Sequence, residues 1–244
     1  MLKQTFQYIA REWLALLLIT AFLAYLPYLA EIVLGSDTST GTGTSIGMLI
    51  VFYFIQRSLL QNVRFASSNN GGAQRSKGML IFSAKAFFLL IVSFIPSLTL
   101  IILAVNNLEK NAAYLVAFLA APVWYFISSF VFALVGTWLP ATIEGQEASI
   151  GAAFARGKKS FFQLLWRLIV FLFAPGTIYL FGAFFVLSYF VESEYSAIAL
   201  ALAFLSTAVN MYMLVFLSVA LVSAYRGNES PEQAVVSHGA PEAS

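Results

Sequence analysis

The sequence contains no cysteine and a single histidine, His238. The absence of cysteine excludes a disulfide framework, a thiolate metal site and a thiol nucleophile, and one histidine excludes a histidine-rich metal cluster. Charged residues make up only 10% of the 244 positions, whereas an ordinary soluble domain has about 25%. So little charge excludes a water-soluble globular domain.

Apolar residues take the place of the missing charge. Hydrophobic residues account for 60% of the chain, and the mean hydropathy is +0.85. This is more apolar surface than one water-facing globule can bury, so most of it must face lipid or pack inside a membrane. The composition therefore predicts an all-α polytopic membrane protein.

Six stretches are long and apolar enough to cross a bilayer core of about 30 Å, which takes about 20 helical residues. The predicted spans cover residues 13–34, 45–63, 79–105, 112–139, 164–190 and 195–225. Arg57 interrupts the second span, for which an in-plane helix or a re-entrant segment is the alternative. The first is longer than the core of a signal peptide and is read as retained. We expect a single six-helix transmembrane bundle over residues 1–226 and a disordered cytoplasmic tail over 227–244.

The basic residues are distributed unevenly between the two sides that six spans would create. The side that carries both termini would hold Lys3, Arg11, Arg57, Arg64, Arg75, Lys77, Lys85, Arg156, Lys158, Lys159, Arg167 and Arg226. The other side would hold only Lys110. Because positively charged loops stay in the cytoplasm, this pattern predicts a multi-pass protein of the cytoplasmic (inner) membrane with both termini cytoplasmic.

The connection over residues 141–163 has the pattern of an amphipathic helix. Apolar residues recur near helical spacing, and acidic residues precede basic ones. This predicts a cytoplasmic interfacial helix between the fourth and fifth spans. Its basic residues Arg156, Lys158 and Lys159 either set the topology or contact anionic lipid.

Within the predicted spans we find neutral polar residues and prolines. Ala203, Ser206 and Asn210 fall on one face of the sixth span, and Pro96 and Pro175 interrupt the third and fifth. A small, polar face favours close helix packing, whereas kinked helices also line transport paths. These five residues are therefore candidates for helix packing or for a substrate path.

The segment Leu139–Lys158, which reads LPATIEGQEASIGAAFARGK, follows the fourth predicted span. It resembles the six-helix membrane-domain family associated with glycerophosphodiester phosphodiesterases, in which a proline and often a glutamate end a span and a surface helix follows. Gly157-Lys158 stands near a position where that family often has serine. The resemblance implies a bacterial cytoplasmic-membrane protein, and no catalytic residue carries over with it.

No ionisable residue lies near the middle of a predicted span, and the sequence has none of the motifs of hydrolases or metalloenzymes. We therefore expect a non-catalytic protein without cofactor or metal that acts through helix-face contacts with another integral membrane protein or by organising membrane lipids. Nucleic acid is not an expected partner. The alternative is a small-solute or lipid transporter built on the kinked helices.

Overall fold

The computed structural model describes residues 1–34, 41–65, 72–145, 149–179, 181–182 and 197–228. The predicted all-helical fold is confirmed over these residues, none of which forms a strand. The elements are α1 (Leu2–Leu34), α2 (Gly41–Gln61), α3 (Gly72–Asn107), α4 (Lys110–Val135), α5 (Trp138–Ile143), α6 (Ile150–Leu168), the π-helix η1 (Ile169–Phe173) and α8 (Ala197–Asn228).

Five of the described helical stretches are long and apolar enough to cross a membrane. They are Leu2–Pro27, Lys77–Asn107, Phe118–Val135, Ile150–Tyr179 and Leu200–Asn228. Each overlaps one of the predicted spans. The second predicted span, residues 45–63, forms most of α2, which is not among the five. The count of six spans therefore stays a prediction.

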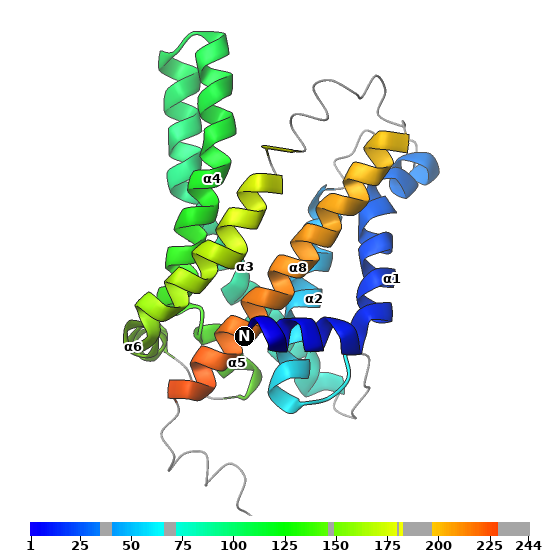
Figure 1. Ribbon diagram of the computed structural model, residues 1–244, viewed down its shortest axis with the longest axis vertical. Helices are drawn as coiled ribbons and strands as arrows, with labels where there is room; N and C mark the ends of the chain where they lie inside the picture. Colours follow the sequence, from blue (N-terminus) through cyan, green and yellow to red (C-terminus); the bar gives the residue numbers. More distant parts are fainter. Residues whose placement is uncertain (35–40, 66–71, 146–148, 180, 183–196, 229–244) are drawn as a thin grey trace, which may run out of the picture.

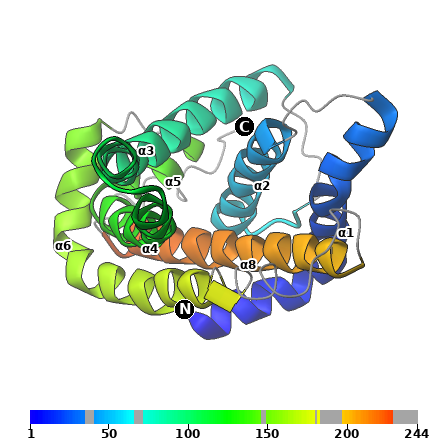
Figure 2. The same ribbon diagram turned by 90° about the horizontal axis from the view of Figure 1, so that it is seen from above.

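Helix α8 lies at the centre of the arrangement. It packs against α1 and α2 on one side and against α6 and η1 on the other (Figures 1 and 2). Helices α3 and α4 form an antiparallel hairpin whose far end stands apart from the other helices (Figure 1). The apolar core lies between these units and includes Phe82, Leu89, Phe132, Leu168, Phe216 and Leu221.

Helices α1 and α6 each change direction along their length. In Figure 2 the first part of α6 lies across the direction of α8 and its second part turns along it, whereas the first part of α1 runs alongside α8 and its later part turns away. The predicted amphipathic helix over 141–163 is wrong in its bounds, because α5 ends at Ile143 and α6 begins at Ile150. Gly145, with φ of 72°, follows the end of α5 in a conformation that favours glycine.

The predicted start of the fifth span at residue 164 falls inside a continuous helix and stays a prediction. Helix α6 continues without interruption through this position into η1, and residues 183–190 lie outside the described part of the chain. The fourth span was predicted to reach residue 139, but α4 ends at Val135 and α5 begins at Trp138. The predicted tail begins too early as well, because α8 continues to Asn228.

The π-helix has a local cause in the sequence. Pro175 has no backbone N–H, so the carbonyl of Phe171 cannot receive the usual helical bond from it. One residue earlier, the Ala174 N–H donates to the carbonyl of Ile169, five residues back, where a regular α-helix would use that of Val170. The widened turn thus absorbs the proline without ending the helix.

Helices α4 and α6 approach each other closely at Gly157. A Cβ atom at this position would lie 1.8 Å from the carbonyl oxygen of Leu134. Nearby, the buried Thr137 hydroxyl donates to the carbonyl of Ala153 at 3.3 Å. A glycine is therefore required where α6 crosses the end of α4.

Candidate functional site

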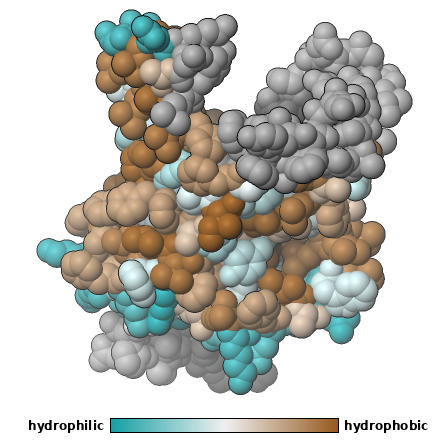
Figure 3. Space-filling model, turned by 45° about the horizontal axis from the view of Figure 1, so that its top comes forward, coloured by the Kyte–Doolittle hydropathy of each residue, from teal (hydrophilic) through white to brown (hydrophobic). Residues whose placement is uncertain are grey.

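Polar interactions gather at one end of the molecule, which we call the basic end. Its cationic residues are Arg11, Lys85, Arg156, Lys158, Lys159, Arg167 and Arg226. Figure 3 shows apolar surface across the middle of the molecule, with polar residues gathered at this end and at the tip of the α3–α4 hairpin. An apolar middle between two polar ends is what a bilayer requires.

At the basic end, Arg226 joins the end of α8 to the end of α2. Its Nη2 donates to the carbonyls of Leu60 at 2.6 Å and Leu59 at 3.4 Å. The last carbonyls of a helix have no partner within it, so a cation placed there satisfies them and complements the helix dipole. Arg226 therefore fixes the two helices together.

Arg11 joins α1 to the same end of α2. Its Nε pairs with the carboxylate of Glu12 at 2.9 Å, and its Nη2 donates to the hydroxyl of Ser58 at 3.2 Å and to the carbonyl of Val63. The Glu12 side chain is buried, and the arginine neutralises it. This ion pair had no counterpart in the sequence analysis, which placed Arg11 in a topological role only.

Helix α5 and the turn after it are held by three further contacts. The Tyr225 hydroxyl of α8 donates to Glu144 Oε2 at 2.9 Å. Lys85 Nζ donates to the hydroxyl of Thr142 at 2.8 Å and lies 4.6 Å from the centre of the Trp138 ring. A cation over an aromatic ring is stabilised by the ring's negative face. These contacts thus tie α5 and the turn after it to α3 and α8.

A cleft of about 460 Å³ opens at the basic end between α6 and the last turns of α8, with Met1 as one wall. Its lining includes Lys158, Lys159 and Arg167 of α6, and Ser223 and Asn228 of α8. Because Met1 and Asn228 share this cleft, the start of the chain and the end of α8 lie at the same end of the molecule. The charge distribution of the sequence predicts both termini on one side of the membrane, and the side itself stays a prediction.

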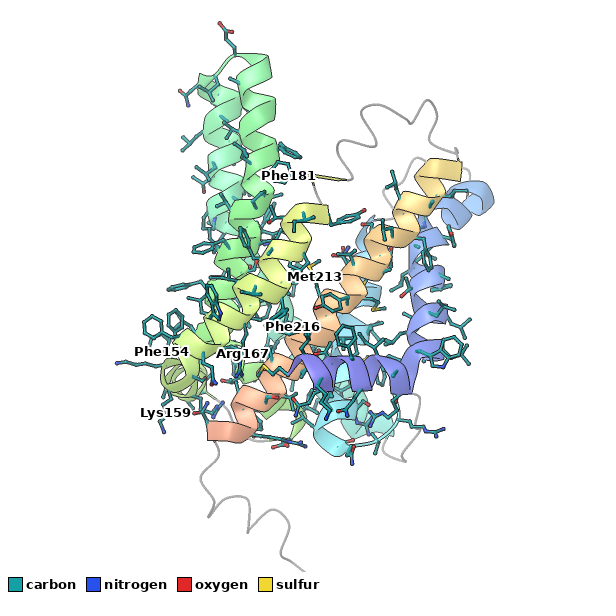
Figure 4. All side chains as sticks on the ribbon, viewed as in Figure 1. Phe154, Lys159, Arg167, Phe181, Met213 and Phe216 are labelled. Carbon is teal, nitrogen blue, oxygen red and sulfur yellow. The ribbon has the colours of Figure 1, made fainter. Side chains whose placement is uncertain are left out.

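The cleft divides the three predicted lipid-contact residues. Lys158 and Lys159 line it, whereas Arg156 does not. The Arg156 guanidinium lies 5.4 Å from the centre of the Tyr225 ring instead. Figure 4 shows Lys159 on the outer side of α6, and Arg167 on the side toward the start of α1. Arg167, which the sequence assigned only to topology, lines the cleft, and the predicted lipid contact of Arg156, Lys158 and Lys159 stays a prediction.

The three predicted packing residues of α8 lie together on a half-buried face of that helix. They are Ala203, Ser206 and Asn210. The surrounding turns contact other parts of the chain. The Tyr179 hydroxyl donates to the carbonyl of Leu202 at 3.4 Å, and the Phe204 ring stacks on that of Tyr25 at 6.4 Å between centres.

The two predicted proline kinks have different settings. Pro96 lies inside α3, which continues past it, and Pro175 follows η1. Of the clefts formed by described residues, neither the one beside Lys158 nor a much smaller one beside Arg57 is lined by either proline or by Asn210.

No family model, curated protein or solved structure matches this chain. The resemblance carried by residues 139–158 therefore stays a prediction. Among the described residues, no three histidine, aspartate or glutamate side chains come together in a way that could hold a metal ion.

Proposed function

We propose that this protein is a non-catalytic integral membrane protein of the bacterial cytoplasmic membrane that binds another integral membrane protein through its α3–α4 hairpin. One observation carries the proposal. Ile91, Ile95, Leu98, Ile102 and Val105 follow one another at intervals of four, three, four and three along α3. We call these five residues the α3 stripe.

The α3 stripe is exposed along its whole length. Its side chains keep between 41% and 64% of their surface accessible. The opposite side of α3 is buried and carries small residues such as Ser93, Ser97 and Ala104, which suits close packing against α4. The α3 stripe has the spacing with which one helix packs against another, and its branched side chains fit such a seam.

The outer side of α4 differs from that of α3. Phe181 meets Phe118 edge to face at 4.8 Å between ring centres, and Phe173 meets Phe126 at 6.1 Å. Figure 4 shows Phe181 directed toward the hairpin. The chain itself therefore covers part of the α4 side, where Phe126 keeps 46% of its surface exposed, whereas the α3 stripe is exposed along its whole length.

The transporter alternative has less support. A transport path would need a cavity between the kinked helices, and the described clefts near Lys158 and Arg57 lie at the basic end instead. Orientation with the basic end in the cytoplasm follows from its charge.

The proposed contact can be tested directly because the sequence contains no cysteine. A single introduced cysteine is therefore the one thiol to which a crosslinker can be attached. We would replace Ile102 with cysteine, attach a photoactivatable crosslinker and irradiate native membranes. We expect a protein adduct of one defined mass. Leu18→Cys, on an exposed apolar position of α1, is the matched control and should give none. An adduct of two copies of this chain would identify the partner as a second copy.

A second variant tests whether the crosslinked protein binds the α3 stripe or only lay near it when irradiated. Replacing Ile95 and Ile102 together with alanine should reduce copurification of the crosslinked protein while leaving the amount of this chain in the membrane unchanged. Replacing Leu14 and Leu18 in α1 should leave copurification intact. If position 102 yields only lipid adducts, the proposal is wrong.

A further inference from the structure

The cleft at the basic end has a lining of one charge sign. Lys158, Lys159 and Arg167 contribute three cations, and the lining includes no acidic side chain among the described residues. Its remaining polar groups, among them Gln163, Ser223 and Asn228, can donate or accept hydrogen bonds. Such a lining attracts an anionic ligand, and its polar side chains can form hydrogen bonds with other polar groups of that ligand.

The three cations of the cleft have no carboxylate partner within the described part of the chain, where the ion pair found is that of Arg11 with Glu12. Arg167 Nη1 instead donates to the thioether sulfur of Met1 at 3.2 Å. A thioether is a weak acceptor, whereas a phosphate oxygen is a strong one for both guanidinium and ammonium groups. The cations of the cleft would therefore form stronger hydrogen bonds with a phosphate than Arg167 forms with the Met1 sulfur.

Aromatic residues on α6 adjoin the cations. Phe161 and Phe162 line the cleft, and Phe162 keeps 84% of its surface exposed. Trp166, one turn further along the same helix, is 67% exposed. Exposed aromatic rings beside basic residues are typical of the boundary between headgroups and acyl chains. A small soluble anion has no apolar part that could pack against these rings, whereas the acyl chains of a lipid can contact them.

The volume of the cleft, about 460 Å³, lies in the range of small-molecule sites. We infer that the cleft binds the headgroup of an acidic phospholipid. Lys158, Lys159 and Arg167 supply the positive charge that attracts its phosphate. The Asn228 amide nitrogen already donates to the carbonyl of Ala224 at 2.8 Å, so its oxygen accepts from the polar part of the headgroup, and the acyl chains lie along Phe162. This site is distinct from the α3 stripe and does not depend on the proposed protein contact.

The first experiment compares lipids on the intact protein. Full-length protein is stripped of lipid in mild detergent, and phosphatidylglycerol or phosphatidylcholine with identical acyl chains is added during native mass spectrometry. Each basic residue near an anionic headgroup is worth roughly fivefold in affinity. We therefore expect phosphatidylglycerol to bind at least about tenfold more tightly than phosphatidylcholine. Equal binding of the two lipids would overturn the inference.

The second experiment locates the site. We expect the double variant Lys158→Gln/Lys159→Gln to weaken phosphatidylglycerol binding by about tenfold or more, and phosphatidylcholine binding hardly at all. Lys3→Gln/Lys77→Gln is the matched control, because it removes two exposed lysines that do not line the cleft. All four lysines are exposed, so both variants should fold, and unchanged melting temperatures would confirm this. Equal losses in the two variants would show diffuse charge attraction and refute a site.

The third experiment distinguishes a lipid from a free anion. Phe162→Ser removes the apolar contact and leaves all three cations, so it should weaken binding of phosphatidylglycerol. Inorganic phosphate, added alone at the same concentration, should not be retained by the wild-type protein. Retention of phosphate together with full lipid binding by Phe162→Ser would show that the cleft takes a soluble anion, and the inference of a lipid would then be wrong.

Discussion

The close approach of α6 to α4 makes Gly157→Ala the sharpest test of the fold. The added methyl carbon would lie 1.8 Å from the carbonyl oxygen of Leu134, 2.5 Å from its carbonyl carbon and 3.0 Å from the carbonyl oxygen of Ala133. Real Cβ atoms essentially never come within 3.0 Å of a heavy atom that belongs to another part of the chain. The two helices must therefore separate by about 1.2 Å to admit the methyl group.

The free-energy cost follows from what has to move. The obstructing atoms belong to the backbone of α4, so no side-chain rotation relieves the clash. Overpacking of this kind costs about 1–3 kcal/mol, and rigid backbone places Gly157→Ala near 3 kcal/mol. In a chain of this size, a loss of that magnitude lowers the melting temperature by roughly 6–12 °C.

The assay is thermal unfolding of the purified protein in mild detergent, followed by tryptophan fluorescence. Gly151→Ala is the matched control on the same helix, because its new methyl group would meet nothing nearer than the Ser149 hydroxyl oxygen at 3.8 Å. It should raise stability by up to about 1 kcal/mol, since alanine favours a helix over glycine. If Gly157→Ala melts with Gly151→Ala rather than far below the wild type, the described approach of α6 to α4 is wrong.

Three further substitutions test single contacts. Tyr225→Phe removes the hydroxyl that donates to Glu144 at 2.9 Å, and a loss of about 1–3 kcal/mol in chemical unfolding is expected; an unchanged midpoint would contradict the contact. Gln56 is fully buried, and neither amide atom has a partner among the described residues, so Gln56→Leu should stabilise the protein by about 1–3 kcal/mol. A decrease would mean that this amide is paired. Pro175→Ala restores a backbone donor, so hydrogen exchange over Ile169–Phe173 should slow as η1 reverts to an α-helix; equal exchange rates would disprove the proposed cause of η1.

The sequence predicts the helices well where long apolar runs carry the signal. The third span, predicted over 79–105, lies inside α3, and the sixth begins and ends within three residues of α8. The region around Gly157 is different. Ile150–Tyr179 forms one continuous stretch that is long and apolar enough to cross a membrane, and hydropathy gives no boundary for a separate helix within it. A break at Gly145 depends on backbone conformation, which composition does not reveal.

The candidate site was only partly predictable. Lys158 and Lys159 stand out because they are adjacent in a basic segment. Arg167 belongs to the same cleft, but its sequence position suggests only a span boundary. Asn228 comes from the other end of the chain, and only the packing of α6 against α8 brings it there. The sequence does not distinguish the α3 stripe from other apolar residues of the predicted spans, because a helix that crosses a membrane is apolar on most of its sides.

The length of α3 bears on where the protein resides. From Met79 to Val105 the helix has 27 residues with one charge, Lys85, which at 1.5 Å per residue amounts to about 40 Å. An average hydrocarbon core measures about 30 Å, so hydrophobic mismatch arises. A thin bilayer forces the hairpin to tilt or the surrounding lipids to stretch, and a thicker one accommodates it upright. The extra length of α3 therefore lets it span an average bilayer core with tilt to spare, and packing against α4 sets the tilt angle.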